Sequence, residues 1–417
     1  MPLMQLGTQT EDVYRKQVPD APVINRERFT HTWVLGKSGV GKTTAMVRWA
    51  VDDIRAGDGV AFFDLHGDAA QELLHYVPPH RRGDVLFYDP SDRDFPIGFN
   101  ILDTVPDHHK PFVASSVVDT FKSIWGHSWG PQLEMFLYAS TAALLDMPGS
   151  TLLGIKYLIT SPSYRARVLA HIEDPSVRDF WETDFETHMP EREQRERTLS
   201  TLNKIGALIA DPTLRNSIGQ PKNRIDFRAI LDQHKILIVS LPQGQLSITK
   251  ASLIGALLLS QLHLTALGRS SREPFHIYID ECHHFGTATI AEMLSGIRKF
   301  GVSLVLGHQY LDQLPSAFRA ALIGTTGTLV SFRLGVSDAE LIADEFHLTR
   351  DDAALTDLRP FVAYAKTGGT TYRLHMPATA APTYPSSSLK IRNAARYRFG
   401  TPRAAIETRI KRFINNT

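Results

Sequence analysis

A glycine-rich loop between an apolar run and a helical pattern is the feature that most constrains this chain. Residues 36–43 match the pattern GxxxxGK[ST]. The apolar run 31–35 precedes the loop, and the helical pattern 44–54 follows it. This strand–loop–helix order distinguishes a phosphate-binding loop (P-loop) from an ordinary glycine turn.

The chemistry of the loop predicts a nucleotide triphosphate and a divalent cation. Small residues allow backbone N–H groups to wrap a phosphate, and the following helix points its positive end at it. Lys42 can reach the β- and γ-phosphates, and Thr43 can ligate Mg²⁺. We therefore predict an ATP and Mg²⁺ site whose nucleotide-binding residues are Gly36, Lys37, Ser38, Gly39, Val40, Gly41, Lys42, Thr43 and Thr44.

Alternating apolar runs and helical patterns predict an α/β fold with a mostly parallel sheet. The runs expected to form strands are 31–35, 59–65, 84–88, 235–241, 275–279, 302–307 and 328–332. A terminal hairpin is expected from 361–366 and 371–376, which flank Gly368-Gly369.

Strand signals become sparse between residues 103 and 221, where helical periodicity predicts an inserted all-α domain. The alternative is a helical half of one continuous fold. The predicted parts are an N-terminal extension (1–30), a discontinuous sheet domain (31–102 and 222–376), the insertion (103–221), and a linker with a basic tail (377–417). The apolar run 251–268 is expected to be a buried helix rather than a membrane span, because it contains Gln261 and His263.

The tail is strongly basic. Residues 386–417 hold eight basic residues and one acidic residue, a net charge of +7 in a chain whose total is +1. Such a tail binds a nucleic acid backbone or an acidic partner, or it is a solvated terminal helix. The single cysteine, Cys282, excludes an internal disulfide, and residues 1–30 lack a secretory pattern, so a cytoplasmic location is expected.

Two carboxylates end the apolar run 275–279. A P-loop enzyme needs an acidic group at a neighbouring strand end for the magnesium shell and another group that activates water. Asp280 fits the first role and Glu281 the second. Cys282, His283 and His284 come next, but three consecutive residues in an extended segment cannot all point at one zinc ion.

Three further positions have both a functional and a structural interpretation. Gln309, after the run 302–307, is a γ-phosphate sensor or a loop residue. Arg298 is an arginine that completes a neighbouring subunit's site, or part of a solvated helix face. His66-Gly67-Asp68 is an active-site loop or a structural turn.

The order of these motifs resembles the HerA/FtsK branch of P-loop motor ATPases. Within it, the chain is most similar to the soluble part of type IV coupling proteins, the TraD/TraG-like ATPases of conjugation and type IV secretion. The resemblance covers about residues 30–380, the helical insertion included. It is carried by the P-loop and by residues 63–68, 129–134, 277–285, 297–301 and 304–314.

The resemblance implies a RecA-like core in a ring, usually a hexamer, with DNA in its channel. It also favours Gln309 as the sensor and Arg298 as the arginine acting in trans. Coupling proteins usually begin with transmembrane helices and HerA proteins with a β-barrel. This chain shows neither, so docking onto a separate membrane component or nuclease is expected.

These features predict a cytoplasmic, ATP-driven DNA translocase, peripheral to the inner membrane where a partner holds it there. The loops 242–247 and 285–290 are candidates for gripping DNA. One rival is a HerA-like motor paired with a nuclease in DNA processing or defence. A rival of another class is a nucleotide-dependent switch that moves no DNA.

Overall fold

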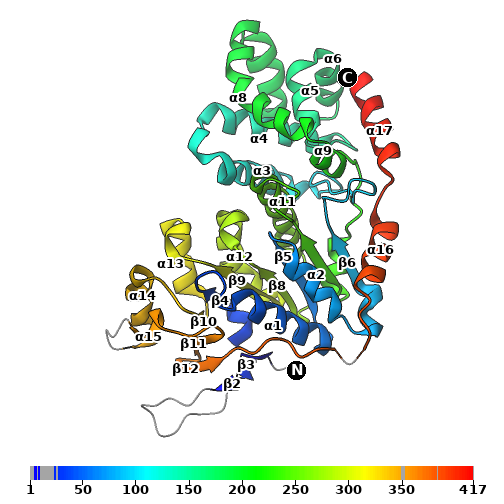
Figure 1. Ribbon diagram of the computed structural model, residues 1–417. Coiled ribbons are helices and arrows are strands. Elements are labelled where there is room, and N and C mark those ends of the chain that lie inside the picture. Colours follow the sequence, from blue (N-terminus) through cyan, green and yellow to red (C-terminus); the bar gives the residue numbers. More distant parts are fainter. Residues whose placement is uncertain are drawn as a thin grey trace. The chain divides into compact units, whose positions relative to one another are not determined.

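The computed structural model describes residues 4–6, 8–9, 23–24, 27–348, 353–382 and 384–416. The chain forms two compact units. The first unit comprises residues 1–88, 227–244 and 265–392, and the second comprises 89–226, 245–264 and 393–417. The elements are labelled in Figure 1.

A 10-stranded sheet organises the first unit. Every strand predicted from an apolar run is present, and each end lies within one residue of its predicted position. In spatial order the strands are β2 (Thr8–Gln9), β12 (Thr370–His375), β11 (Val362–Thr367), β10 (Thr328–Ser331), β4 (Thr32–Leu35), β9 (Val302–His308), β8 (Phe275–Ile279), β5 (Gly59–Asp64), β7 (Ile236–Ser240) and β6 (Val85–Tyr88). A separate antiparallel pair is formed by β1 (Met4–Gln5) and β3 (Val23–Ile24).

The strands from β10 to β6 are parallel, and the β11–β12 hairpin adds an antiparallel edge. All residues of β4, β5, β8 and β9 are buried, which explains their continuous apolar runs. The predicted class, α/β with a mostly parallel sheet, is therefore present.

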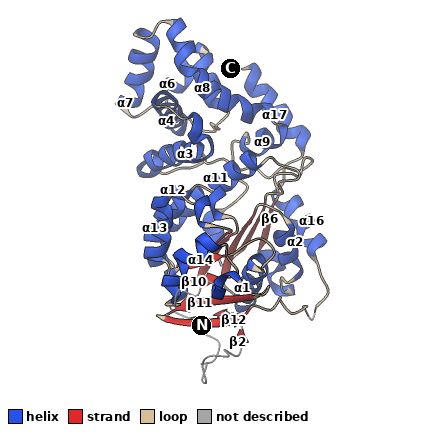
Figure 2. Ribbon diagram, turned by 60° about the vertical axis from the view of Figure 1, so that its left-hand side comes forward, coloured by secondary structure: helices blue, strands red, loops and turns tan. Residues whose placement is uncertain are grey.

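Crossover handedness fixes where the helices of this unit lie. The chain moves one way across the sheet through α1 (Lys42–Ala56) and α2 (Asp68–His75), and the other way through α12 (Thr287–Gly296) and α13 (Ser316–Thr325). Right-handed crossovers then put the two pairs on opposite faces, as Figure 2 shows. The remaining helices that begin in this unit are α10 (Phe227–Asp232), α14 (Val336–Ala343), α15 (Ala353–Thr356) and α16 (Ser388–Phe399).

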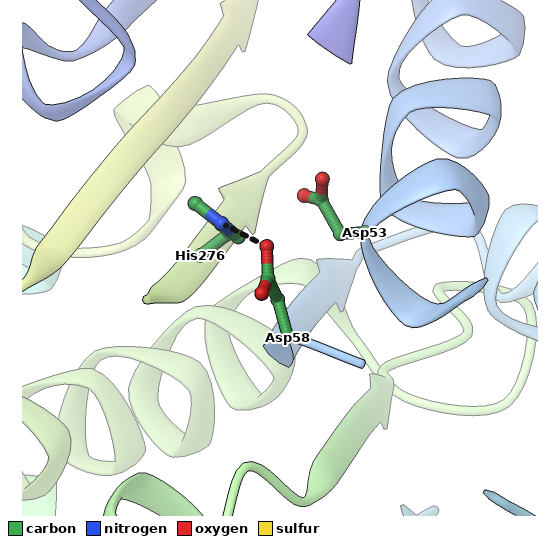
Figure 3. A group of neighbouring side chains, drawn as sticks. All are labelled: Asp53, Asp58 and His276. Atoms are coloured by element: carbon green, nitrogen blue, oxygen red, sulfur yellow. Dashed lines mark hydrogen bonds and ion pairs between the residues drawn. The ribbon is translucent and has the colours of Figure 1, made fainter. Parts of the chain in front are cut away.

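A buried polar network lies at the amino ends of β5 and β8 (Figure 3). His276 joins Asp58 (Nε2–Oδ2 3.2 Å) and Ser303 (Nδ1–Oγ 2.7 Å). The hydroxyl of Tyr278 donates to Asp53 at 2.6 Å. These three side chains, Asp53, Asp58 and His276, could surround a cation, but the hydrogen bonds already satisfy them as a structural network.

The second unit is helical. Residues 89–226, all of which are described, contain no strand. Its helices are α3 (Lys110–Trp125), α4 (Pro131–Asp146), α5 (Gly154–Thr160), α6 (Pro162–Leu169), α7 (Pro175–Asp179), a π-helix (Phe180–Thr187), α8 (Glu191–Ala210), α9 (Pro212–Ile218), α11 (Ile248–Leu267) and α17 (Arg403–Asn415).

Aromatic packing holds the centre of the helical unit. The ring of Phe136 lies 5.8 Å from Phe185, and Trp181 lies 5.0 Å from Phe185. All three side chains are fully buried. On α8 the buried positions include Thr201, Ile205 and Leu208, whereas Leu199 is 58% exposed.

The unit boundaries differ from the predicted ones. The helical unit begins at residue 89 instead of 103 and ends its first segment at 226 instead of 221. It also takes in residues 393–417, which were expected to form an appendage. Ile406 and Ile410 of α17 are buried, so the apolar side of this basic helix packs as core.

One helix among the described residues, α11, is long and apolar enough to cross a membrane. Of its most apolar stretch, 78% is buried inside the structure, as in the core helix of a globular unit. This agrees with the predicted buried helix at 251–268.

Replacing Ile410 by alanine should destabilise the helical unit and leave the phosphate-binding loop unaffected. Ile410 is 6% exposed and its truncation leaves a cavity that costs about 2 kcal/mol or more. The exposed neighbour Arg409→Ala is the control, with an expected change within about 0.5 kcal/mol. Chemical denaturation followed by circular dichroism measures both, and equal effects of the two variants would show that α17 is not part of the core.

Candidate nucleotide-binding and catalytic site

The P-loop connects the end of β4 to the start of α1. Gly39 and Gly41 have φ of 74° and 108°, in the region that glycine adopts without steric cost. Gly41 is the N-cap of α1, so the free backbone N–H groups of the first helical turn face the loop. This geometry presents the donors that an anionic phosphate needs.

Lys42 is held inside the loop. Its ammonium donates to the carbonyl oxygen of Gly36 at 2.7 Å and of Lys37 at 3.3 Å. Burial lowers the pKa of Lys42, and the carboxylates of Asp280 and Glu281 act in the opposite direction. The lysine is therefore positioned before any ligand arrives.

Asp280 connects the P-loop to the end of β8. Thr43 Oγ1 donates to Asp280 Oδ2 at 2.6 Å, although β9 lies between β4 and β8 in the sheet. A hydroxyl and a carboxylate oxygen side by side are the hard oxygen donors that Mg²⁺ prefers. The two residues predicted as metal ligands, Thr43 and Asp280, are thus brought together and fit the ion.

Glu281 follows in the left-handed conformation, with φ of 50°. Its backbone N–H donates to Asp280 Oδ1 at 3.0 Å. Burial and the neighbouring Asp280 raise the pKa of Glu281, while Gln309, Lys42 and His66 oppose that rise. Within the described part of the chain, its buried Oε2 makes no hydrogen bond, and Nδ1 of His283 lies 3.8 Å from it.

Gln309 reaches the same place from the end of β9. Its Nε2 donates to Glu281 Oε1 at 2.8 Å. The Gln313 side chain fixes the backbone here by accepting from the N–H groups of Gln309 and Tyr310, at 3.1 and 3.2 Å. The side-chain amide of Gln309 is therefore held in contact with Glu281 in the absence of a ligand.

The loop after β5 supplies His66. Asp64 accepts from the backbone N–H of His66 and of Ala70, both at 2.9 Å. Segment 66–68 is therefore a structural turn before α2, held by the carboxylate of Asp64. His66 also lines the cavity that contains Lys42 and Glu281.

A cavity of about 220 Å³ collects these groups. It is lined by Ser38, Gly39, Gly41, Lys42, Thr43, Thr44, His66, Asp280, Glu281, Gln309 and Phe361. Of the other predicted loop residues, Lys37 lines an adjoining cavity of about 240 Å³. Phe361 was not predicted, because it belongs to no sequence motif and comes from the hairpin far along the chain.

Cys282, His283 and His284 do not form a metal site. Cys282 is fully buried, and this burial raises the pKa of its thiol far above the usual range. Burial lowers the pKa of His283 to about 4. In the described residues, none of the three belongs to a group of ligand atoms close enough to hold an ion.

Arg298 lies away from this cavity. It is exposed in a 3-10 helix (Ile297–Phe300) just before β9, whose opposite end leads to Gln309. The strand therefore separates Arg298 from the cavity of its own subunit.

Comparison with known proteins shows the fold. The sequence matches no protein-family model and no curated protein. The structure is similar to the unbound bacterial conjugative coupling protein TrwBdeltaN70, with a TM-score of 0.64, 15% identity, and coverage of 91% of both chains. It is also similar to the plasmid coupling protein TrwB in complex with ADP and Mg²⁺, with a TM-score of 0.63, 16% identity, and coverage of 92% of this chain and 97% of that chain.

A third similar structure is VirB4 of Thermoanaerobacter pseudethanolicus. The TM-score is 0.62 and the identity 15%, over 91% of this chain and 96% of that chain. The predicted RecA-like core with a helical domain is confirmed by these similarities, and so is the predicted likeness to coupling proteins at the level of the fold.

Alanine at Gly41 should destabilise the P-loop more than alanine at Gly39. Both positions have positive φ, which costs alanine roughly 1–2 kcal/mol. A Cβ at Gly41 would also lie 2.7 Å from Cδ1 of Phe361, whereas nothing lies within 4 Å of a Cβ at Gly39. Unfolding free energies of both variants measure the difference.

The Phe361→Ala background provides the matched control. There the extra cost of Gly41→Ala over Gly39→Ala should shrink, because the colliding ring is gone and only the difference in backbone strain between φ of 108° and 74° remains. An extra cost of the same size in both backgrounds would mean that the ring does not lie against Gly41.

Proposed function

We propose that this chain is an ATP-driven motor ATPase that translocates DNA in conjugative transfer or type IV secretion. It acts as a ring, for which we propose six subunits. The observation that carries the proposal is the convergence of Asp280, Glu281 and Gln309 on the P-loop from two other strands. The similarity to TrwB, one structure of which is in complex with ADP and Mg²⁺, supports the choice of nucleotide and ion.

In this proposal the P-loop and Lys42 bind the phosphates. The backbone N–H groups between Gly36 and Thr44 receive the β-phosphate, and Lys42 exchanges its carbonyl contacts for the β- and γ-phosphates. Thr43 and Asp280 would hold Mg²⁺, which neutralises charge on the phosphates when bound.

Water activation falls to Glu281. Its raised pKa makes it a stronger base than an ordinary glutamate, and its Oε2 accepts no hydrogen bond within the described residues. Gln309 donates to the other oxygen and so orients the carboxylate. When a γ-phosphate is present, the same amide can turn to it, which makes Gln309 its sensor.

Arg298 acts in trans in this proposal. It is exposed beyond the amino end of β9, away from its own cavity, so its proposed role is in the site of another subunit. The adjoining cavity beside Gln309 is lined by Lys37, Asp312 and Asp338 among others. Burial raises the pKa of Asp338 and Asp312 adds to that rise, whereas the hydrogen bond from the Leu311 N–H and the cations Arg319 and Lys37 oppose it.

The partners follow from the motor role. DNA is the proposed substrate of translocation, and the exposed segment 243–245 favours the first of the two predicted gripping loops. A separate membrane or secretion component would keep the cytoplasmic motor at the inner membrane. A nuclease partner in DNA processing or defence is the second candidate, and a non-translocating switch is the third.

ATP hydrolysis should rise when DNA is added, and the stimulation should weaken as salt increases because phosphate contacts release counterions.

Lys42→Ala should abolish hydrolysis and weaken ATP binding. Glu281→Gln should keep binding but lose turnover, because the carboxylate acts chiefly as water is activated. Steady-state rates with single- and double-stranded DNA, together with binding isotherms, measure these effects.

An intact ring whose rate no DNA changes would favour the switch. Unchanged turnover in Glu281→Gln would remove Glu281 as the base.

Mixing Arg298→Ala with Glu281→Gln subunits should restore activity that neither has alone. An arginine in trans can be worth roughly 10³-fold in rate, and mixed rings rebuild interfaces with both groups intact. The adjacent exposed cation Lys299→Ala is the matched control and should retain the parental rate. The measurement is the ATPase rate across mixing ratios, with subunit exchange verified by labelled protein.

Full activity of Arg298→Ala alone would contradict the assignment. The arginine would then be sought at Arg272, which is exposed before β8, or at Arg333.

A further inference from the structure

Phe361 is an exposed aromatic residue at the rim of the nucleotide cavity. Its side chain is 38% exposed, although the cavity lining includes it. Phe332 is fully buried beside Gly36 and serves packing. Tyr310 is exposed but lines the adjoining cavity, beside Lys37 and Gln309. Phe361 is the phenylalanine that lines the cavity of Lys42 and Glu281 itself, so its ring is the one offered to a ligand there.

The backbone holds Phe361 in an unusual conformation. Its φ is 64°, which is a genuine outlier for a bulky side chain. The N–H of Phe361 donates to Val40 of the P-loop at 2.8 Å, and its carbonyl accepts from Met376 at 2.7 Å. Strain of this kind persists where surrounding structure enforces it and is concentrated at ligand-binding positions.

The ring is thereby fixed relative to the P-loop. A Cβ on Gly41 would meet three of its carbon atoms, Cδ1, Cε1 and Cγ, within 3.4 Å. The loop glycine and the ring are thus in contact. The aromatic surface is preset before any nucleotide binds, so little side-chain entropy is lost on binding.

The strand order places Glu281 and Gln309 on one side of β4 and Phe361 on the other side. In the sheet, β9 and β8 lie on one side of β4, and they bring Gln309 and Glu281. On the other side come β10 and then β11, at whose start Phe361 lies. The terminal phosphate reacts between Lys42 and Glu281, so the remainder of the nucleotide extends away from them.

We propose that Phe361 stacks on the base of the bound nucleotide, and this assignment rests on the proposed ATPase function. A planar, apolar surface at the end away from the reacting phosphate suits a purine ring. Aromatic residues that stack on a base contribute enough that their loss weakens binding roughly ten-fold. The P-loop then binds the triphosphate, and Phe361 gives the preference for a nucleoside over a bare triphosphate.

The test compares MgATP with inorganic magnesium triphosphate, which has no base, by titration calorimetry. Phe361→Ala should weaken ATP binding roughly ten-fold and leave triphosphate binding unchanged. Phe361→Trp should retain ATP affinity, and its fluorescence should be quenched by ATP but not by triphosphate. Phe332→Leu is the matched control, which should change both affinities by the same factor because it acts through loop packing.

Equal weakening of both ligands in Phe361→Ala would make the residue a support of the P-loop and overturn the stacking role. A wild-type protein that binds ATP and triphosphate equally would also overturn it, while leaving the phosphate site intact. A wild-type protein that binds neither would instead overturn the proposed nucleotide site, and the assignment of Phe361 with it.

Discussion

The hydrogen bond from Thr43 to Asp280 joins two parts of the site that the sheet separates. The P-loop follows β4, Asp280 follows β8, and β9 lies between them. This contact is possible only because all three strands run parallel and end at one edge. The intervening strand then delivers Gln309 between the loop and the two carboxylates. This arrangement of side chains is therefore a consequence of strand order, and a different order would leave Gln309 without its contact to Glu281.

Buried polar groups lie at both edges of the sheet. At the amino edge, His276 joins Asp58 and Ser303, and Asp53 accepts from Tyr278, so the buried groups stabilise each other. At the carboxyl edge, Glu281 Oε2 and His308 Nε2 have no hydrogen-bond partner within the described residues. Unsatisfied buried polar atoms cost stability. Glu281 lines the cavity that also holds Lys42, so a ligand bound there would offset part of that cost.

Sequence patterns were sufficient where a residue's position follows from its place on a strand. The placement of Asp280 and Gln309 at the cavity could be predicted because each follows a continuous apolar run, and runs of this kind are strands buried on both faces. Phe361 could not, because its value lies in a contact with Gly41 that no local pattern encodes. The sequence also did not predict that α17 belongs to the helical unit. Its many basic residues indicate an exposed helix, whereas Ile406 and Ile410 are buried.

The separation of Arg298 from its own cavity bears on how copies of this chain would associate. If Arg298 completes a neighbour's site, the amino edge of one subunit's sheet must face the carboxyl edge of the next. Such a contact joins two different surfaces, so it is heterologous, and a two-fold dimer cannot satisfy it on both sides. A heterologous contact repeats until the rotation closes, and every site in the closed ring is then complete. A linear or dimeric form would leave at least one site without its arginine, so the trans assignment and the ring are one hypothesis.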